Sequence, residues 1–121
     1  MVENIYENIG CDYLSHSGFD ILARNYRIRG GEIDIIVKRG RDIYFVEVRH
    51  RSKGSFETAL ESVTRDKMKK IVKTAIHFIN NHLRRKDYNY HFSVMDVGET
   101  EVREILWDAF CIEDVGYYFW P

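Results

Sequence analysis

The sequence contains only two cysteines and has no long uninterrupted run of apolar side chains. A membrane-spanning helix needs roughly 20 apolar residues, so we expect no transmembrane segment. The first ten residues lack the basic start and apolar stretch of a secretory signal, and the expected location is therefore the cytoplasm. Cys11 and Cys111 lie a hundred positions apart and fit no zinc-binding spacing. Disulfides are rare in reducing compartments, so we expect two buried thiols.

The composition is that of a folded chain. Hydrophobic residues make up 45% and aromatic residues 14%, more than a disordered chain carries, while 31% charged residues supply a solvated surface. A length of 121 residues suits one compact core and is too short for two ordinary domains. We therefore predict one domain over residues 1–121.

The net charge of −1 conceals an uneven distribution along the chain. Residues 1–53 carry a net +1, residues 54–87 a net +4 and residues 88–121 a net −6. The basic middle segment is suited to phosphates, although a tight non-specific DNA-binding protein is usually more basic overall. A solvated helix face explains its lysines equally well. The candidate nucleic-acid contacts are Arg51, Lys53, Lys67 and Lys70.

Periodicity of the apolar side chains predicts two helices and five strands. The helices are expected over residues 2–16 and 66–83, and the strands over residues 19–29, 31–38, 42–51, 90–97 and 102–107. A short helical or irregular piece is expected over residues 56–64. The order α-β-β-β-α-β-β predicts an α/β fold in which helices flank a central mixed sheet.

The hairpin between the second and third predicted strands places four charged residues together. With a loop at residues 39–42, Asp34 faces Glu47, and Glu32 faces Arg49. Directly opposed Cβ atoms are about 4.5–5.5 Å apart, so the two carboxylates need a cation between them. Mg²⁺ or Mn²⁺ would accept both as ligands. An ionic network on the outside of the hairpin is the alternative.

Two neighbouring apolar residues favour the metal site over the ionic network. Ile36 and Phe45 share the face of the carboxylates, which indicates that this face is partly covered. A buried carboxylate pair without a cation is costly. Glu7, beside the apolar stripe of the first helix, is a candidate third ligand, although taken alone it reads as a solvent-facing helix residue.

The motifs GEIDII, at residues 31–36, and FVEVRHR, at residues 45–51, resemble those of the bacterial YraN-type family. That family is similar to the restriction-endonuclease-like superfamily, and in particular to archaeal Holliday-junction resolvases. Further matching features, in the same order as in the family, are Glu7, Gly18–Phe19, Arg24–Arg27, Lys67, Asp96 and Ala109–Phe110.

The resemblance implies a divalent metal bound by Glu7, Asp34 and Glu47, and a catalytic lysine at position 49. This chain has Arg49 there. Arginine keeps the positive charge and can stabilise a transition state, but it is effectively never deprotonated. Lys67, Lys53 or His50 are possible substitutes, although strand alternation places His50 on the face opposite Glu47.

The predicted function is therefore that of a Mg²⁺- or Mn²⁺-dependent endonuclease acting on DNA, with branched or structured DNA implied by the resemblance. Its catalytic residues would be Glu7, Asp34, Glu47 and Arg49. The alternative is a catalytically inactive nucleic-acid-binding or protein-interaction module on a nuclease scaffold. The aromatic tail at residues 117–120 would then serve as a homodimer contact, or pack on the chain's own core.

Overall fold

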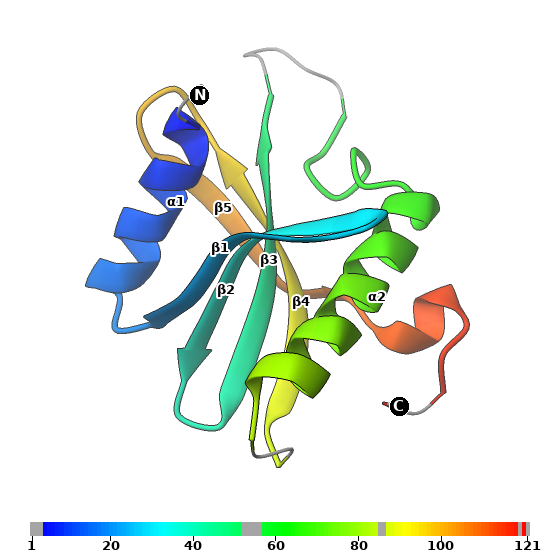
Figure 1. Cartoon of the computed structure of the whole chain (residues 1–121). Helices are drawn as coiled ribbons and strands as arrows, with labels where there is room; N and C mark the ends of the chain where they lie inside the picture. Colours follow the sequence, from blue (N-terminus) through cyan, green and yellow to red (C-terminus); the bar gives the residue numbers. More distant parts are fainter. Residues whose placement is uncertain (1–3, 52–56, 85–86, 119, 121) are drawn as a thin grey trace.

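The computed structural model describes residues 4–51, 57–84, 87–118 and 120. Figure 1 shows a five-stranded sheet with one helix against each face. The elements in chain order are α1 (Ile5–His16), β1 (Asp20–Ile28), β2 (Gly31–Arg39), β3 (Asp42–His50), α2 (Arg65–His82), β4 (Asn89–Val97), β5 (Val102–Phe110) and the 3₁₀ helix η1 (Ile112–Val115). The predicted α/β fold and the order α-β-β-β-α-β-β are confirmed.

The sheet is mixed because one of its strand pairs is parallel. The spatial order is β1-β2-β3-β4-β5, with β3 parallel to β4 and every other neighbouring pair antiparallel. The parallel pair requires a long crossover, which α2 supplies. The core beneath α2 includes Phe45 and Val72, whereas the core beneath α1 includes Leu14 and Met95.

Both helices begin with a side-chain cap that fixes the position of a charged residue. Asn4 accepts a hydrogen bond from the backbone N–H of Glu7 at 3.0 Å, and Thr64 accepts one from that of Lys67 at 3.2 Å. Such caps satisfy backbone donors that have no partner within the helix. Glu7 and Lys67 are therefore held in the first turns of helices on opposite faces of the sheet.

The ladder between β2 and β3 ends before the two strands do. The pairs run from Arg39–Asp42 to Ile35–Val46, which is the register predicted from the hairpin loop. Beyond Ile35, β2 continues its pairing with β1, and β3 continues its pairing with β4. The two central strands therefore separate at the level of Asp34.

The C-terminal part differs from the prediction in two places. Strand β5 continues to Phe110, beyond the predicted end at residue 107, through a bulge near Phe92 and a left-handed Asp108 with φ of 52°. Periodicity does not reveal such an irregularity. The short η1 was not predicted either. In the aromatic tail, Trp120 packs against the core beneath α2, while Tyr118 is 75% exposed.

The remaining boundaries agree with the prediction to within a few residues. Residues 57–64 form turns, which agrees with the irregular one of the two structures predicted for this segment. Residues 2–3 of the predicted first helix, and residue 56, lie outside the described part of the chain. Among the described residues, no helix is long and apolar enough to cross a membrane.

We predict that Gly31→Ala destabilises the fold, because there is no space for a Cβ between β2 and α2 at this position. A Cβ at residue 31 would lie 2.9 Å from the backbone carbonyl oxygen of Lys70 and would collide with the Thr74 hydroxyl. Thr74 is fully buried and hydrogen-bonded to that same carbonyl. Overpacking of this kind costs about 1–3 kcal/mol, which urea unfolding will measure.

Gly98→Ala is the matched control for this prediction. A Cβ at Gly98 meets only the Arg103 side chain, which can move aside. An equal loss of stability in both variants would contradict the proposed clash between β2 and α2.

Candidate functional site

Asp34 and Glu47 are hydrogen-bonded to one another where β2 and β3 separate. The Glu47 side chain is 5% exposed, and its Oε2 is buried without a hydrogen-bond partner among the described residues. Asp34 Oδ2 accepts a hydrogen bond from the Val48 N–H at 2.8 Å. The predicted juxtaposition of the two carboxyl groups is therefore present, and it is more buried than the outside of a hairpin would be.

The two carboxyl groups cannot both be ionised without a cation. Burial, followed by the neighbouring charge and hydrogen bond of Asp34, raises the pKa of Glu47 to about 8. Burial also raises the pKa of Asp34, opposed by hydrogen bonds from Val48 and Glu47. The two carboxyl groups are thus expected to share one proton at neutral pH, as two carboxylates in one site do.

Glu7 lies next to this pair and is itself 5% exposed. Burial and the charge of Asp34 raise the pKa of Glu7, while the side chains of Asn25 and Arg24 oppose the shift. One oxygen accepts a hydrogen bond from Asn4 at 2.6 Å, and the other, Oε1, is buried without a partner among the described residues. The reading of Glu7 as a solvent-facing helix residue is therefore wrong.

These three acidic residues do not form a completed cage. Within the described ranges, no three His, Cys, Asp or Glu side chains are gathered closely enough to hold a metal ion. Asp34 and Glu47 are in contact, and Glu7 interacts with Asp34 from the end of α1.

The positive charges of Lys67 and Arg49 both oppose the rise in the pKa of Glu47. The Nζ atom of Lys67 lies 3.8 Å from Glu47 Oε2. Arg49 is instead held by Ser62, with its Nε donating to the hydroxyl at 2.8 Å and its Nη2 donating to the backbone carbonyl at 3.3 Å. The Arg49 guanidinium is thus anchored to the turn that precedes α2.

The Glu32–Arg49 interaction expected in the ionic-network alternative is absent from the described contacts. Glu32 pairs with Arg27 of β1, with 3.2 Å between Arg27 Nε and the Glu32 carboxylate. Because β2 and β3 have already separated at Asp34, residues 32 and 49 are not partners in the ladder. This expectation from the hairpin register is therefore corrected.

Two other candidates have structural partners. Arg51, a predicted nucleic-acid contact, donates to the buried Asp96 at 2.8 Å. His50 stacks on Tyr6 with 3.7 Å between ring centroids and bonds the Val97 carbonyl oxygen at 2.9 Å. As predicted, His50 faces α1, away from Glu47.

Two of the lysines predicted to contact nucleic acid, Lys67 and Lys70, lie on α2. Lys70 is exposed and lies one turn after Lys67. A cavity of about 430 Å³ is lined by Lys69, Lys70, Lys73, Gly30, Val115, Gly116 and Tyr117. Lys53 lies outside the described residues.

Three residues of the site were missed by the reading of the sequence. Asn25 acts on the charge of Glu7 from a left-handed position in β1, with φ of 50°. Ser62 holds Arg49, and Thr64 caps α2. The role of Thr64 could have been predicted, because a threonine just before an amphipathic run is a typical helix cap. No sequence pattern indicates the roles of Asn25 and Ser62.

The fold and the site define an α/β protein with a buried acidic pair at the centre of a mixed sheet. Residues 6–97 match the family described as "Uncharacterised protein family UPF0102", and the chain belongs to this family. This confirms the resemblance to the YraN-type family that the motifs predicted.

Relatives from distant bacteria match most of the chain. The UPF0102 protein of Vibrio campbellii is 40% identical over 108 residues, covering 88% of this chain and 87% of its own. That of Caldicellulosiruptor bescii is 41% identical over 109 residues, with coverages of 86% and 92%. That of Acinetobacter baumannii is 39% identical over 89 residues, with coverages of 74% and 67%.

We predict that the metal-free protein loses stability as the pH rises from 4.5 towards about 8, partly through Glu47. The folded state raises the pKa of Glu47 from 4.5 to about 8, so in this window the folded chain binds the proton more tightly than the unfolded chain. Stability must then fall with rising pH. Glu47→Gln keeps a donor towards Asp34 but cannot ionise, and its stability should fall less.

Urea unfolding in the presence of a chelator, at several pH values, measures this difference. Glu101→Gln, in an exposed turn, is the matched control and should follow the native chain. Identical pH profiles for the native chain and Glu47→Gln would contradict the shared proton.

Proposed function

We propose that this protein is a Mg²⁺- or Mn²⁺-dependent endonuclease that acts on DNA. The observation that carries the proposal is the buried Asp34–Glu47 pair, with an ammonium group 3.8 Å from Glu47. Carboxylate oxygens are the ligands that these hard cations prefer. Two acidic side chains buried side by side contribute nothing to a hydrophobic core. Such an arrangement is typical of functional sites.

The donor set fits a divalent cation. Glu47 Oε2 and Glu7 Oε1 are both buried and lack a hydrogen-bond partner among the described residues, so each has a free lone pair. Asp34 and Glu47 would hold the ion, with Glu7 as a further ligand from α1. A bound cation of this kind polarises a phosphate and lowers the pKa of a water molecule.

Lys67 is the best-placed residue for the role that the family resemblance assigned to position 49. An ammonium group can give up a proton and the resulting neutral amine can accept one, whereas a guanidinium group stays charged. Lys67 reaches Glu47 from the capped first turn of α2, while Ser62 holds Arg49. We therefore assign the proton-handling cation to Lys67 and a positioning role to Arg49, which ties β3 to the turn before α2.

Support for a DNA substrate comes from the surface that continues from Lys67. Lys70 lies one helical turn along α2, and Lys69 and Lys73 line the same cavity as Lys70 and Tyr117. Lysines bind phosphates as point charges, and an exposed aromatic ring offers a stacking surface for a base. Branched or structured DNA is proposed from the family resemblance, and a cytoplasmic location goes with it.

The orientation of Arg49 also favours a second candidate function. If the family's reaction needs a cation from position 49, a guanidinium held by Ser62 would leave a catalytically inactive module that still binds nucleic acid. Metal binding and DNA binding would then survive without cleavage.

We predict that Mn²⁺ raises the melting temperature of the native chain by about 5 °C or more at saturation, because a ligand of the folded state alone stabilises it. The rise should be larger at pH 8 than at pH 6, since the cation displaces the proton of the Glu47 carboxyl group. Asp34→Asn and Glu47→Gln should abolish the rise, measured by differential scanning fluorimetry. Asp20→Asn, on the exposed start of β1, should retain it. Equal shifts in all four proteins would indicate surface binding instead.

We predict metal-dependent cleavage of labelled DNA, tested on four-way junction, flap, single-stranded and duplex substrates. Asp34→Asn and Glu47→Gln should abolish cleavage. Lys67→Ala should lower kcat by about 10²–10³-fold, the usual loss when one electrostatic group is removed from a site. Its matched control, Lys69→Ala, should change KM rather than kcat.

The opposite result for the Lys67 and Arg49 variants would assign the catalytic cation to position 49. That result is normal cutting by Lys67→Ala together with inactive Arg49→Ala. If no substrate is cut although Mn²⁺ stabilises the chain through Asp34 and Glu47, the second candidate function holds.

A further inference from the structure

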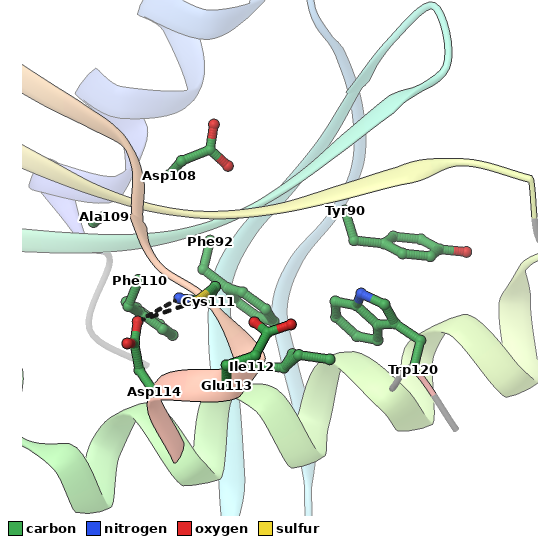
Figure 2. A pocket seen from close by; sticks show the side chains of 10 residues that line it. All are labelled: Tyr90, Phe92, Asp108, Ala109, Phe110, Cys111, Ile112, Glu113, Asp114 and Trp120. Carbon is green, nitrogen blue, oxygen red and sulfur yellow. Dashed lines mark hydrogen bonds between the residues drawn. The ribbon is translucent and has the colours of Figure 1, made fainter. Parts of the chain in front are cut away.

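A separate cavity of about 330 Å³ lies at the other end of β4 from Asp96. It is formed by the start of β4, the end of β5, η1 and the C-terminal tail (Figure 2). We call it the aromatic pocket, defined by Tyr90, Phe92, Cys111, Glu113, Asp114 and Trp120. The proposed nuclease site uses none of these residues.

Three aromatic rings make up one side of the pocket. Trp120 lies 4.9 Å from Tyr90 and 5.7 Å from Phe92 between ring centroids, and its plane is inclined by 14° to that of Phe92. Phe92 is 2% exposed, so this wall is anchored in the core. The Tyr90 hydroxyl is buried and has no hydrogen-bond partner among the described residues. The faces of such rings carry partial negative charge.

Three acidic residues also line the pocket. Asp114 accepts hydrogen bonds from the Cys111 N–H at 2.8 Å and from the Cys111 thiol at 3.4 Å. Asp108, also in the lining, is paired with His91 at 2.6 Å. Glu113 is exposed, and its side chain is hydrogen-bonded to the Cys111 thiol. In Figure 2 its carboxylate points towards the rings of Phe92 and Trp120.

Charge decides which class of ligand suits this pocket. Residues 88–121 carry seven acidic groups and one basic group, so phosphates and other anions are repelled. A cation, by contrast, gains from the aromatic faces and from the negative charge of the Glu113 carboxylate together. At about 330 Å³ the cavity is at the small end of ligand pockets, which suits one side chain better than a nucleotide.

We propose that the aromatic pocket binds the guanidinium group of an arginine side chain presented by a partner polypeptide. A guanidinium is planar, stacks on aromatic faces and offers parallel N–H donors to a carboxylate. Trp120 and Tyr90 supply the rings, and Glu113 supplies the carboxylate. An ammonium group matches fewer of these features.

The two tryptophans allow a direct test on the whole native chain. In an NMR titration of the indole N–H signals, the peptide N-acetyl-Gly-Arg-Gly-amide should shift the Trp120 signal saturably. Trp107 stacks on Phe19 and should not respond. The Trp107→Phe variant assigns the two signals. The same peptide with citrulline, which is neutral but similar in shape, should bind about tenfold more weakly.

Matched variants distinguish binding in the aromatic pocket from a general attraction to acidic side chains. Glu113→Gln should weaken binding of the arginine peptide about tenfold. Glu104→Gln, on the exposed part of β5, should leave it unchanged. Both sites are exposed, so neither change is expected to unfold the chain, and neither should alter DNA cleavage.

Three results would overturn the proposal. These are the absence of a saturable Trp120 shift, equal binding of the citrulline peptide or of the corresponding lysine peptide, and unchanged affinity in Glu113→Gln. None of them bears on the proposed nuclease, because the titration involves no metal and no DNA.

Discussion

The separation of β2 from β3 at Asp34 is the constraint around which the site is built. Where the ladder stops, Asp34 takes the place of a backbone acceptor and receives the Val48 N–H at 2.8 Å. The strand end is therefore satisfied although the neighbouring strand has moved away. Glu47 stays in register with Val94 of β4, so the two carboxyl groups meet at an opening in the sheet. In the metal-free protein, a shared proton is what makes this burial tolerable.

The charged groups around the opening come from elements that are distant in the sequence, and local capping fixes two of them. Glu7 and Lys67 each lie three residues after a capping side chain, Asn4 and Thr64 respectively. The caps set where each helix begins, and the packing of the helices on opposite faces of the sheet brings both first turns towards the opening. A shift of one residue in either helix start would rotate its charge by about 100° away from the site.

The fold and the acidic pair were predictable because they depend on short-range pattern. Alternation in two adjacent strands and the length of one hairpin loop fixed the register, whose last pair, Ile35–Val46, lies directly before Asp34 and Glu47. The partner of Arg49 was not predictable in this way. Ser62 lies in a turn without periodicity, and its position depends on how α2 packs across the sheet. The burial of Glu7 was not predictable either, because a residue beside an apolar stripe is buried or exposed according to tertiary packing.

The uneven charge along the sequence places different charges around the two proposed sites, and this connects the two proposals. The basic face of α2 continues from the acidic pair through Lys67 and Lys70, whereas the aromatic pocket belongs to the acidic segment 88–121. A polyanion would be attracted by the first surface and repelled by the second, and a cationic side chain the reverse. A net charge of −1 is thus compatible with a nucleic-acid site, because acidic residues of the segment 88–121 line the aromatic pocket, where they favour a cationic partner.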